Sequence, residues 1–345
     1  AMSIYSELSM SEIEITTPTW RSLIASFLPG IGKSTLWQVV SKPDFYRAQE
    51  IEELASIFPE LAEFQRKTPK FDLAVKRANE QVTLAKQLGC QIVGFWDGHY
   101  PRTFRKASMS PALFWFKGNL EALKLPQIAV IGTRHPTKSG VITVERITAA
   151  LAANGLNIVS GLALGIDSIA HASAINAGGK TVAIMPGGLD NIAPKTNVPL
   201  AENILDSGGG LLSEFPIGLP PLPANFVTRD ATQEALSIAV VLIQSGKQGG
   251  SLHASRAIVK LKRRLVVAAP TPNDIENGEP GIEANALFSN HKYMDVISSM
   301  SFPDNVESYS YILRGRDQYP ELVHYVREAW ESLAVALNAP SKLPN

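Results

Sequence analysis

Three glycine-bearing segments, each placed directly after a short apolar run, have the residue types best suited to bind a phosphate group. They are Gly132-Thr133-Arg134, the octapeptide Ser160-Gly161-Leu-Ala-Leu-Gly165-Ile-Asp167, and Gly187-Gly188-Leu189-Asp190. A glycine at the end of a strand lets the backbone turn tightly and present N–H groups to an anion. Because the carboxyl ends of parallel strands meet at one edge of a sheet, we expect the three turns to converge on one pocket.

Each of these turns is a weak signal when it is taken alone. The first lacks the G-x-G-x-x-G spacing of a dinucleotide site, and it also fits a structural strand–helix turn with a surface arginine. Ser160 is not in a G-x-S-x-G elbow, which argues against a hydrolase nucleophile. Asp167 and His171 share a helix face but have no further metal ligands nearby in the sequence. We therefore expect no catalytic residue, no metal and no cofactor.

A fourth segment, Gly32-Lys33-Ser34, resembles part of a phosphate-binding P-loop. That motif requires a glycine five residues before Gly32, where this chain has Phe27. The segment also follows a helical pattern, with Trp20, Leu23, Ile24 and Phe27 at helical spacing, and not a strand. We interpret it as the turn of a helix-hairpin-helix, which could touch a DNA phosphate; a packing or partner-binding bundle is an equal alternative.

Composition and charge limit the class of protein. The chain has 345 residues, 45% hydrophobic and 19% charged, which is typical of globular domains and not of disorder. Lys+Arg and Asp+Glu are 32 each, so attraction to nucleic acid must come from a local patch. The single cysteine, Cys90, fits a reducing cytoplasm and excludes a disulfide framework within one chain. No apolar run reaches 18 residues, so no membrane contact is expected.

The N-terminus carries Glu7, Glu12 and Glu14 without a basic start and an apolar stretch, so we expect no secretion signal. Ala1-Met2 is interpreted as an addition before the natural start.

From Gln127 onward, apolar runs alternate with helical patterns, which predicts a parallel sheet with helices on both faces. The expected strands are 128–131, 156–160, 181–185, 211–212, 238–243 and 265–268. The expected helices are 141–153, 166–177, 197–207 and 252–261. The predicted fold class is thus α/β, a Rossmann-like doubly wound, mostly parallel sheet, preceded by a small all-α domain.

These patterns divide the chain into four parts. They are a helix-hairpin-helix or SAM-like domain (1–68), a connecting helix and strands that extend the core (69–126), the Rossmann-like core (127–300) and a short helical tail (301–345). Within them, a long helix is expected over 71–88, a strand over 91–96, an apolar run over 111–116 and a tail helix over 321–337.

The order and spacing of the glycine motifs resemble the DNA-processing protein A family, also known as DprA or Smf. The resemblance rests on Gly132-Thr133-Arg134, Ser160–Asp167 with Ala170-His171, Gly187–Asp190 and Ser213-Glu214-Phe215-Pro216, and it extends from about Tyr100 to Leu287. It implies an extended Rossmann fold and a cytoplasmic, non-enzymatic protein. It further implies that the protein binds single-stranded DNA, forms homodimers and helps to load a RecA-type recombinase during transformation.

Three elements depart from the family pattern. Its F-P-x-R-N-R element is present as Phe226-Val-Thr-Arg229-Asp230-Ala231, so the asparagine and the second arginine are lost. Its S-G-S-L-x-T-A element is present as Gly249-Gly250-Ser251-Leu-His-Ala-Ser255. Asn285-x-Leu287 fits a later N-x-L element without the usual Gly-Ala. The site is therefore less cationic, and weaker DNA binding or a changed ligand stays open.

The resemblance implies a set of DNA-contacting residues. They are Gly132, Thr133, Arg134, Ser160, Gly161, Gly165, Gly187, Gly188, Phe226, Arg229, Gly250 and Ser251. Arg134 and Arg229 could hold phosphates and Phe226 could stack on a base, although core packing is an equal interpretation of Phe226. The basic run Lys260, Lys262, Arg263 and Arg264 fits a solvated helix end better than a DNA contact.

The alternative hypothesis is a nucleotide-binding or nucleotide-sensing protein on the same core. Relatives of the phosphoribohydrolases carry P-G-G-x-G-T-x-x-E, whereas Pro186-Gly187-Gly188 is followed here by Leu-Asp-Asn. The missing glutamate argues against hydrolysis but leaves ligand sensing, for instance in defence, as an alternative.

Overall fold

The computed structural model describes residues 15–66, 68–107 and 109–338. These residues form two compact units, one within residues 1–100 and 111–117 and the other within residues 101–110 and 118–345. The segment with Glu7, Glu12 and Glu14, on which the expectation about a secretion signal rests, lies outside the described residues, as does Ala1-Met2.

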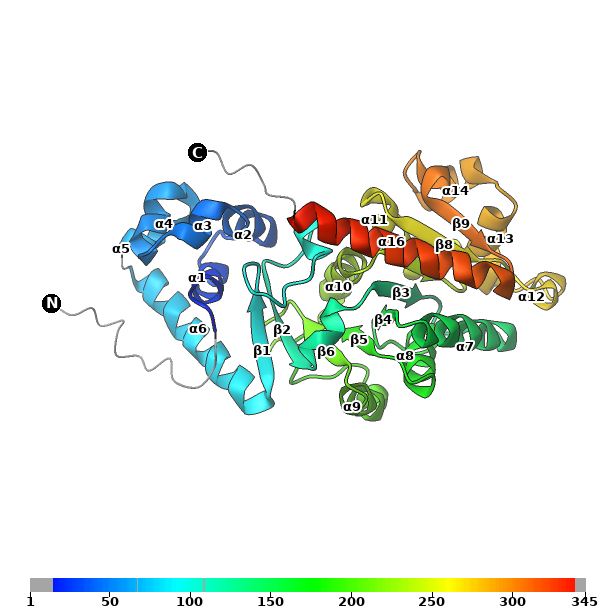
Figure 1. Ribbon diagram of the computed structural model, residues 1–345, viewed down its shortest axis with the longest axis horizontal. Helices are drawn as coiled ribbons and strands as arrows, with labels where there is room; N and C mark the ends of the chain where they lie inside the picture. Colours follow the sequence, from blue (N-terminus) through cyan, green and yellow to red (C-terminus); the bar gives the residue numbers. More distant parts are fainter. Residues whose placement is uncertain (1–14, 67, 108, 339–345) are drawn as a thin grey trace. The chain divides into compact units, whose positions relative to one another are not determined.

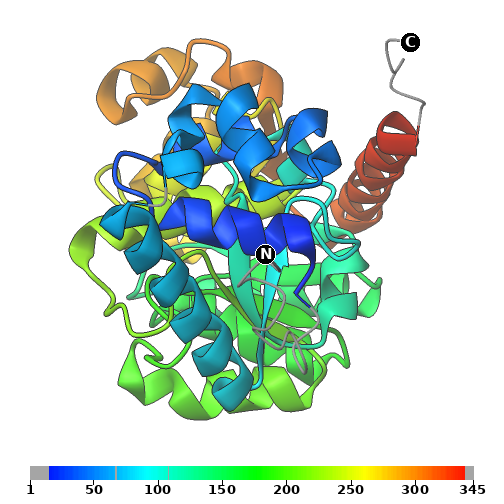
Figure 2. The same ribbon diagram turned by 90° about the vertical axis from the view of Figure 1, so that its left-hand side faces the viewer.

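The first unit consists of short helices, one long helix and a strand pair (Figure 2). Its elements are α1 (Thr17–Ser26), α2 (Lys33–Val40), α3 (Pro43–Arg47), α4 (Ile51–Ile57), the 3-10 turn η2 (Pro59–Leu61), α5 (Glu63–Arg66), α6 (Pro69–Leu88), β1 (Cys90–Gly94) and β2 (Leu113–Gly118). Thr16 and Thr68 cap α1 and α6 through their hydroxyls, and Gly89 ends α6 at φ 65°. β1 and β2 are antiparallel, with Ile92 opposite Trp115.

The second unit is built on seven strands that pair in parallel in the order β6-β5-β4-β3-β7-β8-β9 (Figure 1). They are β3 (Gln127–Ile131), β4 (Asn157–Ser160), β5 (Thr181–Ile184), β6 (Gly210–Ser213), β7 (Ala239–Leu242), β8 (Arg264–Ala268) and β9 (Ser310–Leu313). The chain moves outward from β3 to β6 and then returns to β7 on the other side of β3. The topological switch point of this doubly wound sheet is therefore between β3 and β7.

Helices connect these strands on both faces of the sheet. They are α7 (Lys138–Ala153), α8 (Ile166–Asn176), α9 (Val198–Asp206), α10 (Pro223–Leu236), α11 (Ser251–Lys260), α12 (Pro272–Glu276), α13 (Glu283–Ser289), α14 (Tyr293–Met300), α15 (Val306–Tyr309) and α16 (Tyr319–Asn338). Short 3-10 turns are η3 (Phe104–Lys106), η4 (Leu120–Lys124), η5 (Lys195–Asn197), η6 (Pro280–Ile282) and η7 (Arg316–Gln318). α7 and α8 pack together on one face, and α10 and α11 pack together on the other.

A core of fully buried aliphatic side chains joins β3, β4, β7 and β8 to α7 and α16. Ile128, Val130, Ile158, Val241 and Val266 come from the strands, while Val144, Leu151 and Leu322 come from the helices, and each is 0% exposed. Strands buried on both faces explain why the sequence shows apolar runs there and no alternation. The predicted fold class, with its helical N-terminal segment, is confirmed; the four-part division of the chain stays a prediction.

The expected list lacks six helices and strands of the second unit: α10, α12, α13, α14, α15 and β9. α10 escaped detection because Arg229, Thr232, Gln233 and Glu234 are polar and yet buried, which removes the apolar periodicity of an ordinary helix. β9 is only four residues long and adds an edge strand from the segment expected to be a tail. Among the described residues, no helix is long and apolar enough to cross a membrane.

Candidate nucleic-acid interface

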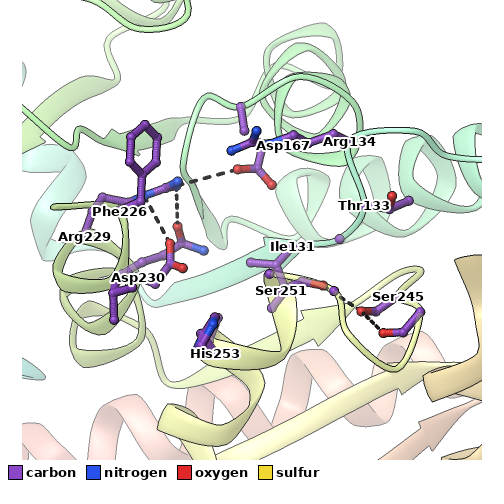
Figure 3. A pocket seen from close by; sticks show the side chains of 18 of the residues that line it. Ile131, Thr133, Arg134, Asp167, Phe226, Arg229, Asp230, Ser245, Ser251 and His253 are labelled. Atoms are coloured by element: carbon purple, nitrogen blue, oxygen red, sulfur yellow. Dashed lines mark hydrogen bonds and ion pairs between the residues drawn. The ribbon is translucent and has the colours of Figure 1, made fainter. Parts of the chain in front are cut away.

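A cavity of about 450 Å³ opens at the carboxyl ends of β3 and β7, at the switch point of the sheet (Figure 3). Its lining comes from the loop after β3, the loop after β4 with the start of α8, one face of α10, and the loop between β7 and α11 with the first turn of α11. The lining residues are Ile131, Gly132, Thr133, Arg134, His135, Ala163, Asp167, Phe226, Val227, Arg229, Asp230, Gln233, Ser245, Gly246, Gly249, Gly250, Ser251, His253 and Ala254. Ligands of open α/β sheets bind at this position.

The loop after β3 is tightly packed against its neighbours, and its residue Arg134 lines the cavity. A Cβ on Gly132 would lie 2.7 Å from Cγ1 of Ile166, and Gly165, at φ 76°, lies against the backbone carbonyl of Arg134. The backbone N–H of Thr133 donates to the carbonyl of Gln244 at 2.9 Å. The Arg134 side chain is exposed, and among the described residues its guanidinium has no hydrogen-bond or ion-pair partner. It is therefore available to bind an anion from solvent.

Gln244, which the sequence analysis did not single out, holds this loop in place. Its side chain is buried and donates to Thr137 at 2.9 Å and to Asp274 at 3.0 Å, while its Oε1 accepts from the Thr137 N–H at 3.1 Å. Gly140 leaves room for it, since a Cβ there would lie 2.1 Å from Oε1 of Gln244. These hydrogen bonds connect the start of α7 to the end of β7, at the place in the sheet where the cavity opens.

Arg229 of α10 is buried and paired, in contrast to Arg134. Its Nη1 lies 3.7 Å from Oδ2 of Asp167, and its Nε lies 3.2 Å from Oδ1 of Asp230 (Figure 3). The octapeptide makes this burial possible, because Gly161 has no side chain where the guanidinium lies. Two carboxylates thus offset the charge of Arg229, and the arginine of the cavity lining that stays open to solvent is Arg134.

The acidic groups around Arg229 are affected by burial. Burial raises the pKa of Asp230 to about 6; Asp167 raises it further, whereas Arg229 and Arg134 lower it. Burial also raises the pKa of Asp167, against the lowering effect of Arg229 and of hydrogen bonds from Ala163 and Gly161. Glu234, one turn after Asp230, is fully buried and its pKa lies well above the usual range, mainly because of desolvation.

Phe226 lies on the first turns of α10 and is half-buried in the cavity wall. The guanidinium carbon of Arg229 lies 5.8 Å from the centre of its ring. Figure 3 shows the ring standing beside the Arg229–Asp230 pair, away from the sheet. The neighbouring Val227 is 56% exposed. An aromatic ring at the mouth of a cavity beside an exposed arginine can serve as a platform for a base.

The loop before α11 forms the opposite wall. Gly250 precedes the first residue of α11 without a side-chain cap, so backbone N–H groups at the helix start remain available to an anion. Ser251 donates through Oγ to Oγ of Ser245 at 2.9 Å. Asn285 fixes Ser245 by accepting its N–H at 2.9 Å and by donating to the carbonyls of Ile243 and Ala268, both at 2.9 Å.

The structure brings together seven of the twelve residues proposed to contact DNA and leaves five outside the lining. Gly132, Thr133, Arg134, Phe226, Arg229, Gly250 and Ser251 line the cavity. Ser160 is buried and donates to the carbonyl of Val130 at 2.7 Å. Gly161 and Gly165 pack behind the lining. Gly187 and Gly188 have the 216–221 backbone where a Cβ would lie, so that segment fills the third turn.

Sequence reasoning missed Gln233, Ser245 and Gly246 among the lining residues, and it noted Gly249 and His253 only as members of a family element. Asp167 and Asp230 were noticed, but their ion pairs to Arg229 were not. The signal that could have found Gln233 is the row of polar residues in α10, which is unusual for a helix that packs on a sheet. His171 is buried with Nδ1 2.6 Å from Oγ1 of Thr181. Within the described residues, no cluster of three potential metal ligands is present.

The basic run after α11 has structural partners. Arg263 donates to the carbonyls of Glu234, Ala235 and Ser237 at the end of α10, at 3.1, 2.8 and 2.7 Å. Arg264 lies over the ring of Tyr325, with its guanidinium carbon 3.6 Å from the ring centre. Both arginines are therefore engaged inside the second unit, whereas the sequence analysis favoured a solvated helix end for this run.

In the first unit, α1 and α2 flank the turn expected for a helix-hairpin-helix. Gly30 adopts φ 84°, and no heavy atom lies within 4 Å of the place that a Cβ would take on Gly30 or Gly32. Lys33 and Ser34 belong to the first turn of α2, after Gly32 as its N-cap. The arrangement helix, glycine turn, helix is present, and its contact with DNA stays a prediction.

The chain is similar to known proteins over this region. The family model of DNA recombination-mediator protein A matches residues 91–291, which is more than half of the chain. Protein Smf of Escherichia coli (strain K12) is 35% identical over 184 residues, covering 53% of this chain and 48% of its own length. DNA processing protein DprA of Streptococcus pneumoniae (strain R6) is 38% identical over 156 residues, 45% of this chain and 55% of that protein. The chain therefore spans about half the length of the curated relatives it matches.

Solved structures show the same fold. DNA processing protein A from Streptococcus pneumoniae aligns with a TM-score of 0.66 over 89% of this chain and 98% of that chain, at 23% identity. DNA processing protein A from Helicobacter pylori, described for its single-stranded DNA binding mode, aligns with a TM-score of 0.54 over 69% of this chain and 96% of that chain, at 24% identity. The match of the family model over residues 91–291, together with the relatives above 30% identity, places this chain in the DNA recombination-mediator protein A family.

Proposed function

We propose that this chain binds single-stranded DNA in the cavity at the carboxyl ends of β3 and β7. The observation that carries the proposal is the joint presence, in one cavity, of the exposed Arg134, the uncapped start of α11 and the half-buried ring of Phe226. Single-strand binders combine cationic contacts to the backbone with aromatic platforms for the bases. Family membership supports this choice of ligand, as does the single-stranded DNA binding described for the Helicobacter pylori protein.

In this proposal the different walls of the cavity bind different parts of a nucleotide. Arg134 and the N–H groups of Gly250 and Ser251 bind phosphate, and Phe226 stacks on a base. Arg229 does not contact phosphate in this proposal, because its guanidinium is already paired with Asp167 and Asp230. It holds both carboxylates in place in the cavity lining. Gly161 and Gly165 allow the close packing behind these groups.

We infer further that the protein acts by binding and not by catalysis. On the same grounds of family membership, we propose a cytoplasmic homodimer that protects single-stranded DNA and presents it to a RecA-type recombinase during DNA uptake and recombination. Two cavities in one dimer would raise the avidity for a strand long enough to reach both.

The experiment that tests the function compares three ligands by fluorescence anisotropy: a single-stranded oligonucleotide, the same sequence as duplex, and a mononucleotide. The proposal expects the single strand to bind best, since only an unpaired base can stack on Phe226. Equal affinity for the duplex would contradict it, because Arg134 would then contact phosphate without any use of the aromatic wall.

The size of the cavity favours one second candidate. A volume of about 450 Å³ falls in the range of pockets that enclose a single small ligand. A nucleotide-binding or nucleotide-sensing protein would show a rise in melting temperature with a mononucleotide and none with an oligonucleotide. The proposed DNA binder shows the opposite pattern, so one set of thermal melts separates the two functions.

A further inference from the structure

Asp230 places a carboxylate in a cavity that is proposed to receive DNA, which is itself negatively charged. Its side chain is 22% exposed and lines the cavity beside Phe226. Oδ1 lies 3.2 Å from Nε of Arg229, whereas Oδ2 has no hydrogen-bond or ion-pair partner among the described residues. An ionised carboxylate only accepts hydrogen bonds. A ligand group that approaches it must therefore donate.

The other carboxylate of the cavity is less available. Asp167 is 8% exposed. Its Oδ2 accepts from the N–H of Gly161 at 3.2 Å and lies 3.7 Å from Nη1 of Arg229. Gln233 is 2% exposed and its Oε1 lies 3.5 Å from the same Nη1. The Asp167 side chain is 11% exposed against 22% for Asp230, so of the two acidic side chains that line the cavity Asp230 is the more accessible to a ligand.

We propose that Asp230 makes this cavity selective for guanine, with the base stacked on Phe226 and its N1–H and N2–H donating to the two carboxylate oxygens. The inference rests on the proposed binding of single-stranded DNA. In this arrangement Arg134 and the start of α11 bind the phosphate of a nucleotide, and Asp230 binds the base of the same nucleotide.

The chemistry of the four bases explains the selectivity. Guanine carries two neighbouring donors on its Watson–Crick edge, which match the two oxygens of a carboxylate. Adenine and cytosine place one amino donor next to a ring nitrogen that accepts, and thymine places one N–H between two carbonyl oxygens. For these three bases, an acceptor would lie against the carboxylate and repel it, and an unpaired polar contact in a partly buried site is costly.

The Asp230 carboxylate can select a base because an ion pair fixes its position and because it is partly shielded from water. The Arg229 ion pair fixes Oδ1, and the helix α10 that carries Asp230 also carries Phe226, one turn earlier on the same face. The groups that face Asp230 are Arg229, Glu234 and Gln233 on its own helix, Asp167 on α8 and Arg134 on the loop after β3. A ligand acceptor would meet two nearby carboxylates, and a ligand donor would be favoured by both.

The first test uses the wild-type protein and changes only the base. Short thymidine oligonucleotides each carry a single guanine, 7-deazaguanine, hypoxanthine, adenine or cytosine, and their affinities are measured by anisotropy at pH 8. Hypoxanthine lacks the N2 amino group and 7-deazaguanine keeps both donors. We expect guanine and 7-deazaguanine to bind alike and about tenfold more tightly than hypoxanthine. Equal affinity for guanine and hypoxanthine would overturn the inference.

The second test uses Asp230→Asn, which keeps the size of the side chain and turns one acceptor into a donor. This variant should bind the oligonucleotides without guanine more tightly, because a negative charge is removed, and should lose the difference between guanine and hypoxanthine. A variant that keeps the guanine preference would assign the selectivity to another group and refute the role of Asp230. The melting temperature shows whether the variant is folded; if it is not, the base series on the wild type decides alone.

The outcomes separate the inference from the function on which it depends. Binding of single strands without base preference rejects the part given to Asp230 and leaves the DNA-binding proposal intact. Absence of binding to any oligonucleotide rejects both. A guanine preference shown only by mononucleotides, with no oligonucleotide binding, would reject the DNA-binding proposal and support the nucleotide-binding alternative.

Discussion

The guanidinium of Arg229 occupies the space that a side chain at Gly161 would need: a Cβ on Gly161 would lie 1.1 Å from Nη1 of Arg229. The glycine belongs to the turn that follows β4, and the arginine belongs to α10. The octapeptide Ser160–Asp167 therefore leaves space for the buried side chain of Arg229, and Arg229 in turn pairs with Asp167 and Asp230.

Gly161→Ala should displace Arg229 and break both of its ion pairs. Because the arginine is 5% exposed and cannot move freely into solvent, we expect a loss of roughly 2–4 kcal/mol in the free energy of unfolding. Chemical denaturation measures this loss. Gly281→Ala is the matched control in the same unit, since no heavy atom lies within 4 Å of the position of its Cβ. Equal stability of the two variants would show that Arg229 tolerates displacement.

Asp230→Asn should change how stability depends on pH. The folded state raises the pKa of Asp230 from 3.8 to about 6, so the folded protein binds this proton more tightly than the unfolded chain. The ionised group therefore lowers stability progressively as the pH rises from about 4 to about 6, and the variant escapes that loss. Above pH 6 we expect the variant to be more stable by up to about 3 kcal/mol.

Thermal melts of both proteins between pH 4 and pH 8 check this sign. The difference in melting temperature should be small near pH 4, grow up to about pH 6 and then stay constant. Asp167 and Glu234, whose pKa values are also raised, titrate in both proteins and largely cancel in the difference. A variant that loses stability as the pH rises, relative to the wild type, would contradict the assignment.

Phe226→Ala should weaken binding of single-stranded DNA between about fivefold and a hundredfold, the range of one lost base stack. Phe226→Trp, which keeps an aromatic platform, should retain most of the affinity. Ile142→Ala removes an exposed apolar side chain of α7 that lies outside the cavity lining, and it serves as the control. Core packing is the competing role for Phe226, and it would lower the melting temperature while leaving the affinity of the folded protein unchanged.

The sequence was sufficient to predict the fold because its strands are buried on both faces. Residues such as Ile128, Val130 and Val241 produce unbroken apolar runs, and the helices between them have clear periodicity. α10 could not be found in this way. Its buried face carries Arg229, Gln233 and Glu234, and the partners that offset the charge of Arg229 include Asp167 from another element, which no local pattern reveals.

The candidate site was only partly predictable, for the same reason. Arg134 and Gly250 follow strand ends, and strand ends can be located from the sequence. The pairing of Arg229 with Asp167 joins residues 62 positions apart, and the filling of the third glycine turn depends on the path of residues 216–221. Contacts of this kind are set by the tertiary arrangement and not by spacing along the chain.

The measurement that most directly tests the central claim is the salt dependence of single-stranded DNA binding by Arg134→Ala. Arg146→Ala, which removes an exposed arginine of α7 outside the cavity lining, is the matched control. We expect Arg134→Ala to weaken binding and to reduce the slope of log K against log salt by about 0.7, the loss of one phosphate contact on a single strand. The control should leave the slope unchanged. An unaltered slope for Arg134→Ala, or an equal reduction in both variants, would contradict binding at the cavity that opens at the carboxyl ends of β3 and β7.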